Sequence, residues 1–200
     1  MAGFSAIADV GETLRRLLEA DLQAALGLNP PGPGPGPPGP GTLTVTLKSP
    51  KAIEDDGQTQ TNQLSIFLYR VLENPDLRNR PPFAVSITSE QPTPLALDLC
   101  YMLTAYSGDE QTRHRILGRA MQFMHENAVL QGSVLQGQLS GTVERIRISA
   151  QQLTQDVVSQ VWQAIAVSMQ VSAFYLVTPI LIEPAEEPTA ERVRERILEE

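Results

Sequence analysis

The sequence predicts an α+β fold in which helices flank a mostly antiparallel sheet. Two kinds of apolar spacing follow one another along the chain, in the order helix, strands, helix, strand, helix, strand. Hydrophobic residues make up 42% of the 200 residues and charged residues 19%, a balance that allows a sizeable core and is not that of a disordered chain. No internal repeat is visible, and the length fits one domain with appendages.

The first helix is predicted at residues 4–26, where apolar residues recur at near-helical spacing. Ser5 is suited to its N-cap, and Gly27 is suited to its C-terminal end. We expect its apolar face to pack on the core of the same chain, with a neighbouring subunit as the alternative.

A proline–glycine stretch follows at residues 29–41. Residues 30–41 contain seven prolines and five glycines, without the strict period of a collagen helix. Because proline has no backbone N–H, the stretch predicts an exposed spacer loop. A proline-rich ligand for a partner domain is the alternative.

Four extended segments are predicted next, at residues 42–50, 64–75, 83–89 and 94–107. Residues 51–62 and 76–82 are polar connectors between them. The second extended segment is apolar on both faces, which favours a central place in the sheet. Asp98 lies among apolar residues of the last segment, where an acid needs a partner, and we expect Arg70 to be that partner.

The second half of the chain predicts two helices and two strands. A helix is expected at residues 110–126, with Met121 among its buried residues and Asp109 or Glu110 at its start. A strand at 142–150 follows a loop punctuated by glycines. The second helix opens near Thr154, and an extended segment at 168–183 completes the core.

The C-terminal residues differ in composition from the rest. Between Glu183 and Glu200 the chain carries seven acidic residues and three arginines, a balance of −4 that is half of the formal net charge of −8. We therefore predict one domain over residues 1–183 and an acidic tail over 184–200. A helix in this tail would be too short to hold alone in water.

Composition and charge exclude several classes of protein. A net charge of −8 argues against a non-specific nucleic-acid binder, which needs a basic surface. A single cysteine, Cys100, rules out an intrachain disulfide framework and is compatible with a reducing compartment. No signal peptide is visible and no run of about 18 apolar residues occurs, so we expect a soluble protein in the cytoplasm that neither spans a membrane nor binds one.

No pattern of residues indicates catalysis. The sequence lacks a phosphate-binding glycine loop, a nucleophile elbow and the common zinc motifs. His114 and His125 are three helical turns apart, too far to share a metal ion. Residues 54–56 are three acids in a polar connector, where solvation is the simpler interpretation. We predict no catalytic, cofactor-binding or metal-binding residue and no enzyme activity.

Five segments, in this order, carry a resemblance to a known family. They are "FSAIADVGETLRRLLE", "LSIFLYRVLENPDLRNRPP", "PLALDLCYMLTAYSGDEQ", "ILGRAMQFMHENAVL" and "SQVWQAIAVSMQVSAFYLVTPILI". Together they resemble the Pvc16 N-terminal domain family, whose members include cap or tail-terminator proteins of extracellular contractile injection systems. The resemblance runs from about residue 4 to residue 183 and departs from the family at residues 29–41 and in the acidic tail.

The resemblance implies a structural role. It implies a phage tail-terminator-like subunit that forms a homohexameric ring on the distal end of the inner tube and sheath, stops polymerisation and stabilises the particle. The implied partners are the sheath and inner tube proteins, with no cofactor. Assembly would be cytoplasmic, in a phage-tail-like particle that is then released. An adaptor or baseplate-associated component of the same machine is the alternative, and a small-ligand enzyme or carrier is a more distant one.

Five residues are candidates for the interfaces of such a subunit. Arg78, Arg80 and Phe83 lie in and beside the polar connector that precedes the third extended segment. Tyr106 lies at the end of the predicted strand 94–107. Trp162 is a further candidate, with a place in the core as the alternative.

Overall fold

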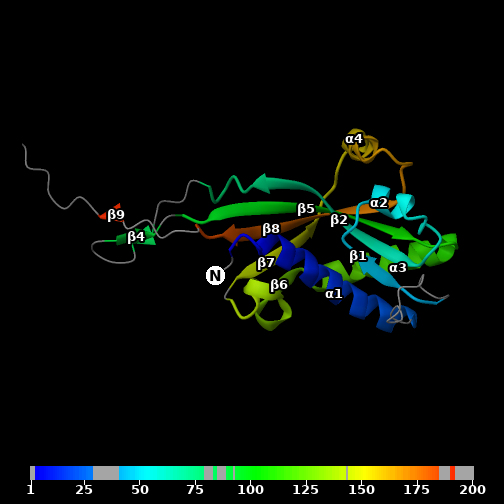
Figure 1. Ribbon diagram of the computed structural model, residues 1–200, viewed down its shortest axis with the longest axis horizontal. Coiled ribbons are helices and arrows are strands. Elements are labelled where there is room, and N and C mark those ends of the chain that lie inside the picture. Colours follow the sequence, from blue (N-terminus) through cyan, green and yellow to red (C-terminus); the bar gives the residue numbers. More distant parts are fainter. Residues whose placement is uncertain are drawn as a thin grey trace, which may run out of the picture.

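The computed structural model describes residues 3–28, 41–78, 83–84, 89–91, 93–142, 144–184 and 190–191. A six-stranded sheet forms the centre of the fold (Figure 1). Its strands, in spatial order, are β1 (Thr44–Thr46), β2 (Gln63–Glu73), β5 (Leu95–Tyr106), β8 (Ser172–Ile182), β7 (Arg145–Ala150) and β6 (Val129–Gln131). β1 is parallel to β2 and every other neighbouring pair is antiparallel. The predicted α+β class with a mostly antiparallel sheet is therefore confirmed.

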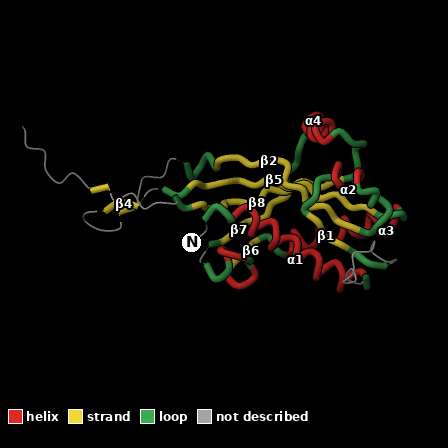
Figure 2. Tube along the Cα trace, viewed as in Figure 1, coloured by secondary structure: helices red, strands yellow, loops and turns green. Residues whose placement is uncertain are grey.

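Helices cover both faces of this sheet. The four α-helices are α1 (Ala6–Leu26), α2 (Pro50–Asp55), α3 (Glu110–Glu126) and α4 (Gln155–Ile165). Two short 3₁₀ turns, Gly132–Val134 and Gly137–Leu139, follow β6, and the second lies against α1. Figure 2 shows α4 on one side of the strands and α1 on the other. No helix among the described residues is long and apolar enough to cross a membrane.

The alternating pattern of the long strands produces two separate cores. On the face of α1 and α3, Leu64 and Ile66 of β2 join Leu99, Tyr101 and Leu103 of β5 in the larger core. On the other face, a smaller core consists of Met102, Phe174 and Trp162, with Phe67 and Tyr69 of β2 packed against it. The predicted central place of residues 64–75 is confirmed, because β2 lies between β1 and β5 and is apolar on both faces.

Local chemistry explains where the helices begin and end. Gly27 ends α1 in the left-handed conformation, with φ of 63°, as predicted. Asp109 caps α3 by accepting a hydrogen bond from the Thr112 backbone N–H at 2.8 Å. Ser5 occupies the predicted N-cap position of α1, but its hydroxyl donates to Asp9 rather than capping the helix.

Four details of the predicted elements and of their burial were wrong. The strand predicted at 42–50 is only three residues long, and α2 fills the start of the predicted polar connector because Ser49 caps it and Pro50 suits its first turn. The glycine-punctuated loop contains β6, whose pairing with β7 no local pattern announces. Met121 is 44% exposed instead of buried, because it lies at the edge of the apolar stripe of α3.

A small second sheet lies beyond the open ends of β2, β5 and β8 (Figure 1). Its strands are β3 (Phe83–Ala84), β4 (Ser89–Gln91) and β9 (Ala190–Glu191), in the order β3-β4-β9. The pairing brings part of the predicted tail beside part of the predicted segment 83–89. Most of the predicted loop at 29–41 and most of the tail at 184–200 lie outside the described residues, so the domain boundary stays a prediction.

Candidate interface surfaces

Asn74 fixes the chain at the point where β2 leaves the sheet. Its side-chain N–H₂ donates to Asp98 Oδ1 at 2.8 Å and to Thr178 Oγ1 at 3.2 Å. Its side-chain carbonyl accepts from the backbone N–H groups of Asp76 and Leu77, at 3.0 and 3.1 Å. The carboxamide is 9% exposed in this network. One residue thus joins β2, β5 and β8 and shapes the turn that leads to Arg78.

This network corrects the expected partner of Asp98. Asp98 accepts hydrogen bonds from Asn74 and from the hydroxyl of Thr178. Among the described residues no ion pair joins it to Arg70, which lies opposite Cys100 in the register of β2 and β5. The prediction was right that a polar partner is needed, but uncharged side chains supply it.

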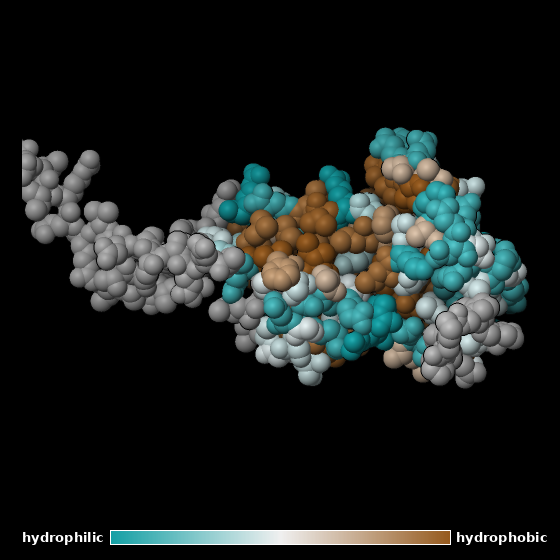
Figure 3. Space-filling view, in the orientation of Figure 1, coloured by the Kyte–Doolittle hydropathy of each residue, from teal (hydrophilic) through white to brown (hydrophobic). Residues whose placement is uncertain are grey.

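An apolar surface lies next to this turn, on the α1 face of the sheet. β2, β5 and β8 extend past the start of α1. The side chains at this end of the three strands are left partly uncovered. Val71 is 42% exposed and Leu95 46%, and Phe4 just before α1 is 91% exposed. Figure 3 shows brown surface over this part of the sheet. We name these three residues and the exposed Arg78 the open end of the sheet. Apolar surface beside a cation is typical of a protein-binding surface.

The remaining candidates from the sequence fall in different places. Arg80 lies outside the described residues. Phe83 is the first residue of β3, and only its backbone is described. The structure therefore places Arg78 in the open end and does not bring the five candidates together at one site.

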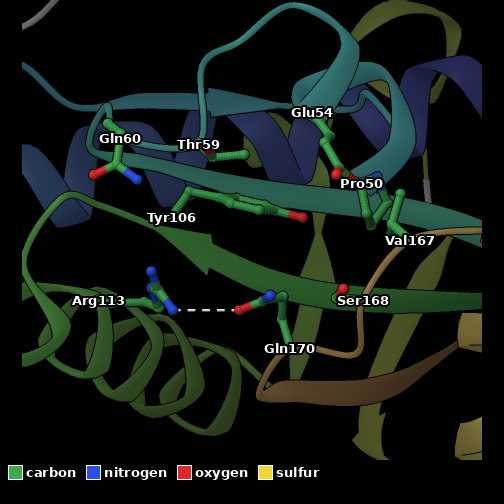
Figure 4. Close-up of a pocket in the computed structure, with 9 residues that line it drawn as sticks. All are labelled: Pro50, Glu54, Thr59, Gln60, Tyr106, Arg113, Val167, Ser168 and Gln170. Carbon is green, nitrogen blue, oxygen red and sulfur yellow. Dashed lines mark hydrogen bonds between the residues drawn. The ribbon is translucent and has the colours of Figure 1, made fainter.

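Tyr106 lies in a polar hollow at the opposite end of β5. The hollow has a volume of about 270 Å³ and is lined by α2, the loop before β2, the start of α3 and the loop before β8. The hydroxyl of Tyr106 points toward Glu54 and Pro50, and Arg113 donates a hydrogen bond to Gln170 at 3.2 Å across the hollow (Figure 4). Tyr106 itself is only 6% exposed.

Burial and two neighbouring charges set the protonation state of Tyr106 in this hollow. Burial raises the pKa of Tyr106 to about 12, with the charge of Glu54 adding to the rise and Arg113 opposing it. The phenol is therefore neutral near pH 7 and can donate a hydrogen bond, but it cannot act as a base. Arg113 is held by Glu110 at 3.0 Å and by the carbonyl of Ser107 at 3.3 Å.

Trp162 attaches α4 to the outer face of the sheet. Its ring is 2% exposed and lies between Met102 and Phe174, and its indole N–H donates to Ser172 Oγ at 3.3 Å. Tyr69 meets Phe174 edge to face, with ring centroids 5.6 Å apart. The side chain of Trp162 is thus in the core in this structure, and its effect on any surface passes through the position of α4.

The described residues contain no group of three or more side chains suited to hold a metal ion. His114 pairs with Glu110 on the surface of α3, at 3.2 Å. Two of the acids at 54–56 pair with lysines, Asp55 with Lys51 and Asp56 with Lys48. Cys100 is buried at 2% exposure, and burial raises the pKa of its thiol, so it is not an activated nucleophile.

Comparison with known proteins agrees with the architecture. The family model described as the Pvc16 N-terminal domain matches residues 9–196. The chain belongs to this family. No curated protein matches the chain.

Two solved structures share the fold. One is the sheath/tube terminator of an extracellular contractile injection system, PVC, in its extended state: the TM-score is 0.62 at 15% identity, over 97% of this chain and 62% of that one. The other is the anti-feeding prophage cap, a tube-terminating cap, with a TM-score of 0.57 at 13% identity, over 96% of this chain and 60% of that one. The chain therefore spans less than two thirds of the length of either protein.

Asn74 is the residue of these surfaces that sequence reasoning missed. Its signal was the dipeptide Asn74-Pro75 directly after a strong strand, which indicates a turn. The partners Asp98 and Thr178 lie 24 and 104 positions away, so no local pattern could name them.

Proposed function

We propose that this protein is a structural cap, or tail terminator, of a contractile injection system. Membership of the Pvc16 N-terminal domain family supports this proposal. The observation that carries it is the likeness of 97% of the chain to a sheath/tube terminator, with a tube-terminating cap as a second solved structure of the same fold. The protein acts by binding and has no catalytic role.

The mechanism is the occupation of acceptor surfaces. The end of a growing tube or sheath exposes surfaces, including strand edges, that accept another layer. The open end of the sheet supplies exposed apolar side chains and Arg78 for such a contact. The outer surface of α1 is different, because Glu12, Arg15, Arg16 and Glu19 form ion pairs there and keep it hydrated. The open end of the sheet therefore binds the end of the tube or sheath, and the outer surface of α1 does not accept a further layer.

Ring symmetry strengthens a contact of this kind. A homohexamer on the particle repeats each contact around the axis, so modest contacts add as avidity. The sheath and the inner tube are the partners. Assembly takes place in the cytoplasm, in a particle that is released afterwards. The acidic tail is a second contact for a neighbour or for a basic segment of the sheath.

The test is the length distribution of particles assembled with and without this protein, measured by electron microscopy. Irregular lengths or separated tubes and sheaths in its absence would support the proposed function. Unchanged particles would contradict it, and would favour a component located elsewhere in the machine.

Arg78 and Arg80 are predicted to contribute to end binding. Changing both to glutamate should lower the occupancy of tube and sheath ends at least about tenfold, because each cation would become a like charge facing its former partner. The matched control is Arg145→Glu with Arg147→Glu, which has the same spacing on β7, and both of these side chains are exposed. Normal end occupancy in the Arg78 and Arg80 variant would remove these residues from the interface.

A further inference from the structure

Residues 151–171, which we name the α4 segment, bury very little for their composition. The segment connects β7 to β8 and contains 11 apolar residues among its 21, yet Trp162 alone is buried. α1 provides a comparison of equal length. It has 12 apolar residues among 21 and buries seven residues. Apolar side chains of the α4 segment are therefore left at the surface, with Val157 39%, Met169 55% and Val171 60% exposed.

The α4 segment is also almost free of charge. Asp156 is the one charged residue of its 21, whereas α1 carries six. Six glutamines supply most of the remaining polarity of the α4 segment. A solvent-facing helix normally carries charges on its outer face. Depletion of charge together with exposed apolar side chains is typical of the core of a protein interface.

Hollows flank α4 on its two sides. One of about 600 Å³ lies between the α4 segment, the middle of α3 and the start of β8, and is lined by Met121, Leu153, Val158 and Phe174. The other, of about 390 Å³, lies between α4 and β2, and is lined by Phe67, Tyr69, Val161 and Ile165. Figure 1 shows α4 standing above the sheet on its two connecting segments. A raised helix with apolar hollows beside it can interlock with side chains of a neighbour.

We propose that the α4 segment is the surface through which one copy of this protein contacts the next copy. The assignment rests on the proposed function, since it names the contact that would close the ring. Copies of one chain carry the same net charge of −8 and repel one another. They can meet at least cost where few charges face the partner, and Asp156 is the one charged residue of the α4 segment. A tube or sheath subunit that depended on charge complementarity for specificity would find only Asp156 on the α4 segment.

The α4 segment can supply part of one side of such an interface. A stable protein interface involves about 20–30 residues on each side. Twelve of the 21 residues of the α4 segment are exposed, so the segment accounts for about half of one side and neighbouring surface supplies the rest.

Photo-cross-linking from Val157 tests the proposal directly. Val157 is replaced by the photoreactive residue p-benzoylphenylalanine, particles carrying the protein are irradiated, and the products are identified by mass spectrometry. Val134 is the matched control, because it is also an exposed valine, at 40% against 39%, and lies in the 3₁₀ turn Gly132–Val134, outside the α4 segment. We expect position 157 to give a covalent dimer of this chain, and position 134 to give at least about tenfold less of it.

A second experiment introduces a negative charge into the α4 segment and measures the association of copies. Val157→Glu and, separately, Met169→Glu should each lower copy-to-copy association on the particle at least about tenfold, whereas Val134→Glu should leave it unchanged. Tryptophan fluorescence of Trp162 checks that α4 remains in place in each variant. Both positions are exposed, so folding should not be affected.

The outcomes separate this proposal from the proposed function. A cross-link from position 157 to a tube or sheath protein, or none, in particles that contain the chain would overturn the assignment of the α4 segment and leave the terminator function standing. Absence of the chain from particles would overturn both.

Discussion

At the scale of single residues, Asn74 links the open end to the centre of the sheet. Its carboxamide makes four hydrogen bonds, two to side chains of β5 and β8 and two to the turn that carries Arg78. The position needs a side chain that both donates and accepts hydrogen bonds, and the carboxamide of asparagine does both. The orientation of the chain beyond β2 thus depends on one polar contact at the end of an apolar strand.

Replacing Asn74 with alanine should lower the free energy of unfolding by about 2–3 kcal/mol, because Asp98 and Thr178 lose a partner in a largely buried place. Urea-induced unfolding measures the loss. Asn127→Ala is the control, since the Asn127 side chain makes one hydrogen bond, to the carbonyl of Phe123, and should cost about 1 kcal/mol or less. Equal losses in the two variants would contradict the special role of Asn74.

At the scale of elements, α1 and α4 end in the same backbone conformation with different residues. Gly27 ends α1 at φ 63°, and Ala166 ends α4 at φ 61°. Glycine adopts this left-handed conformation freely, whereas an alanine there costs about 1 kcal/mol. The backbone N–H of Ala166 still donates to Trp162 and Gln163, so the helix is closed in the same way. The C-terminal end of α4 is therefore less stable with Ala166 than it would be with a glycine at this position.

Ala166→Gly should raise the free energy of unfolding by a few tenths to about 1 kcal/mol, because relief of the left-handed strain exceeds the extra entropy of glycine in the unfolded chain. Ala164→Gly is the control. It lies within α4 and is exposed, and it should cost about 1 kcal/mol. Thermal unfolding of the two variants should shift in opposite directions, and a shift in the same direction would refute the assignment of strain to Ala166.

Over the whole molecule, the tyrosine phenols and the cysteine thiol share one direction of pKa change. All four tyrosines have a raised pKa, mainly through burial, and burial also raises the pKa of Cys100. Burial raises the pKa of Tyr69 to about 12. Ordinary values in an unfolded chain are about 10 for tyrosine and about 8.5 for cysteine. The folded protein thus keeps protons that the unfolded chain releases.

The free energy of unfolding should therefore fall as pH rises above about 9, and these groups should leave it unchanged below about pH 8, where both states are protonated. Urea unfolding over this range measures the fall. The absorbance of tyrosinate provides an independent check, because folded protein should titrate at higher pH than protein in denaturant. Coincident titrations would show that the tyrosines are not protected by the fold.

Several features of the fold followed from local patterns alone. The spacing of apolar residues predicted α1, β2, β5, α3 and α4 close to their observed bounds, because the periods of helices and strands are local properties. β1, α2 and β6 were missed or misjudged in length. Each is six residues or shorter, and a few residues contain too little of any period to be distinguished.

The candidate surfaces were less accessible to sequence reasoning. Arg78 and Tyr106 were chosen for their places at the ends of strands, and the structure puts them at opposite ends of the sheet, beside an open apolar surface and within a polar hollow. Whether either contacts a partner stays a prediction.

The sequence by itself determined the α+β order, the two-faced apolar strands and the scarcity of charge in residues 151–171, where Asp156 is the one charged residue, since these are properties of neighbouring positions. Tertiary structure alone decided that Asn74 meets Thr178 across 104 positions and that Trp162 is the single buried residue of the α4 segment. The reason is physical: burial and hydrogen bonding depend on which distant segments meet, and the same apolar spacing is compatible with a covered helix and with an uncovered one.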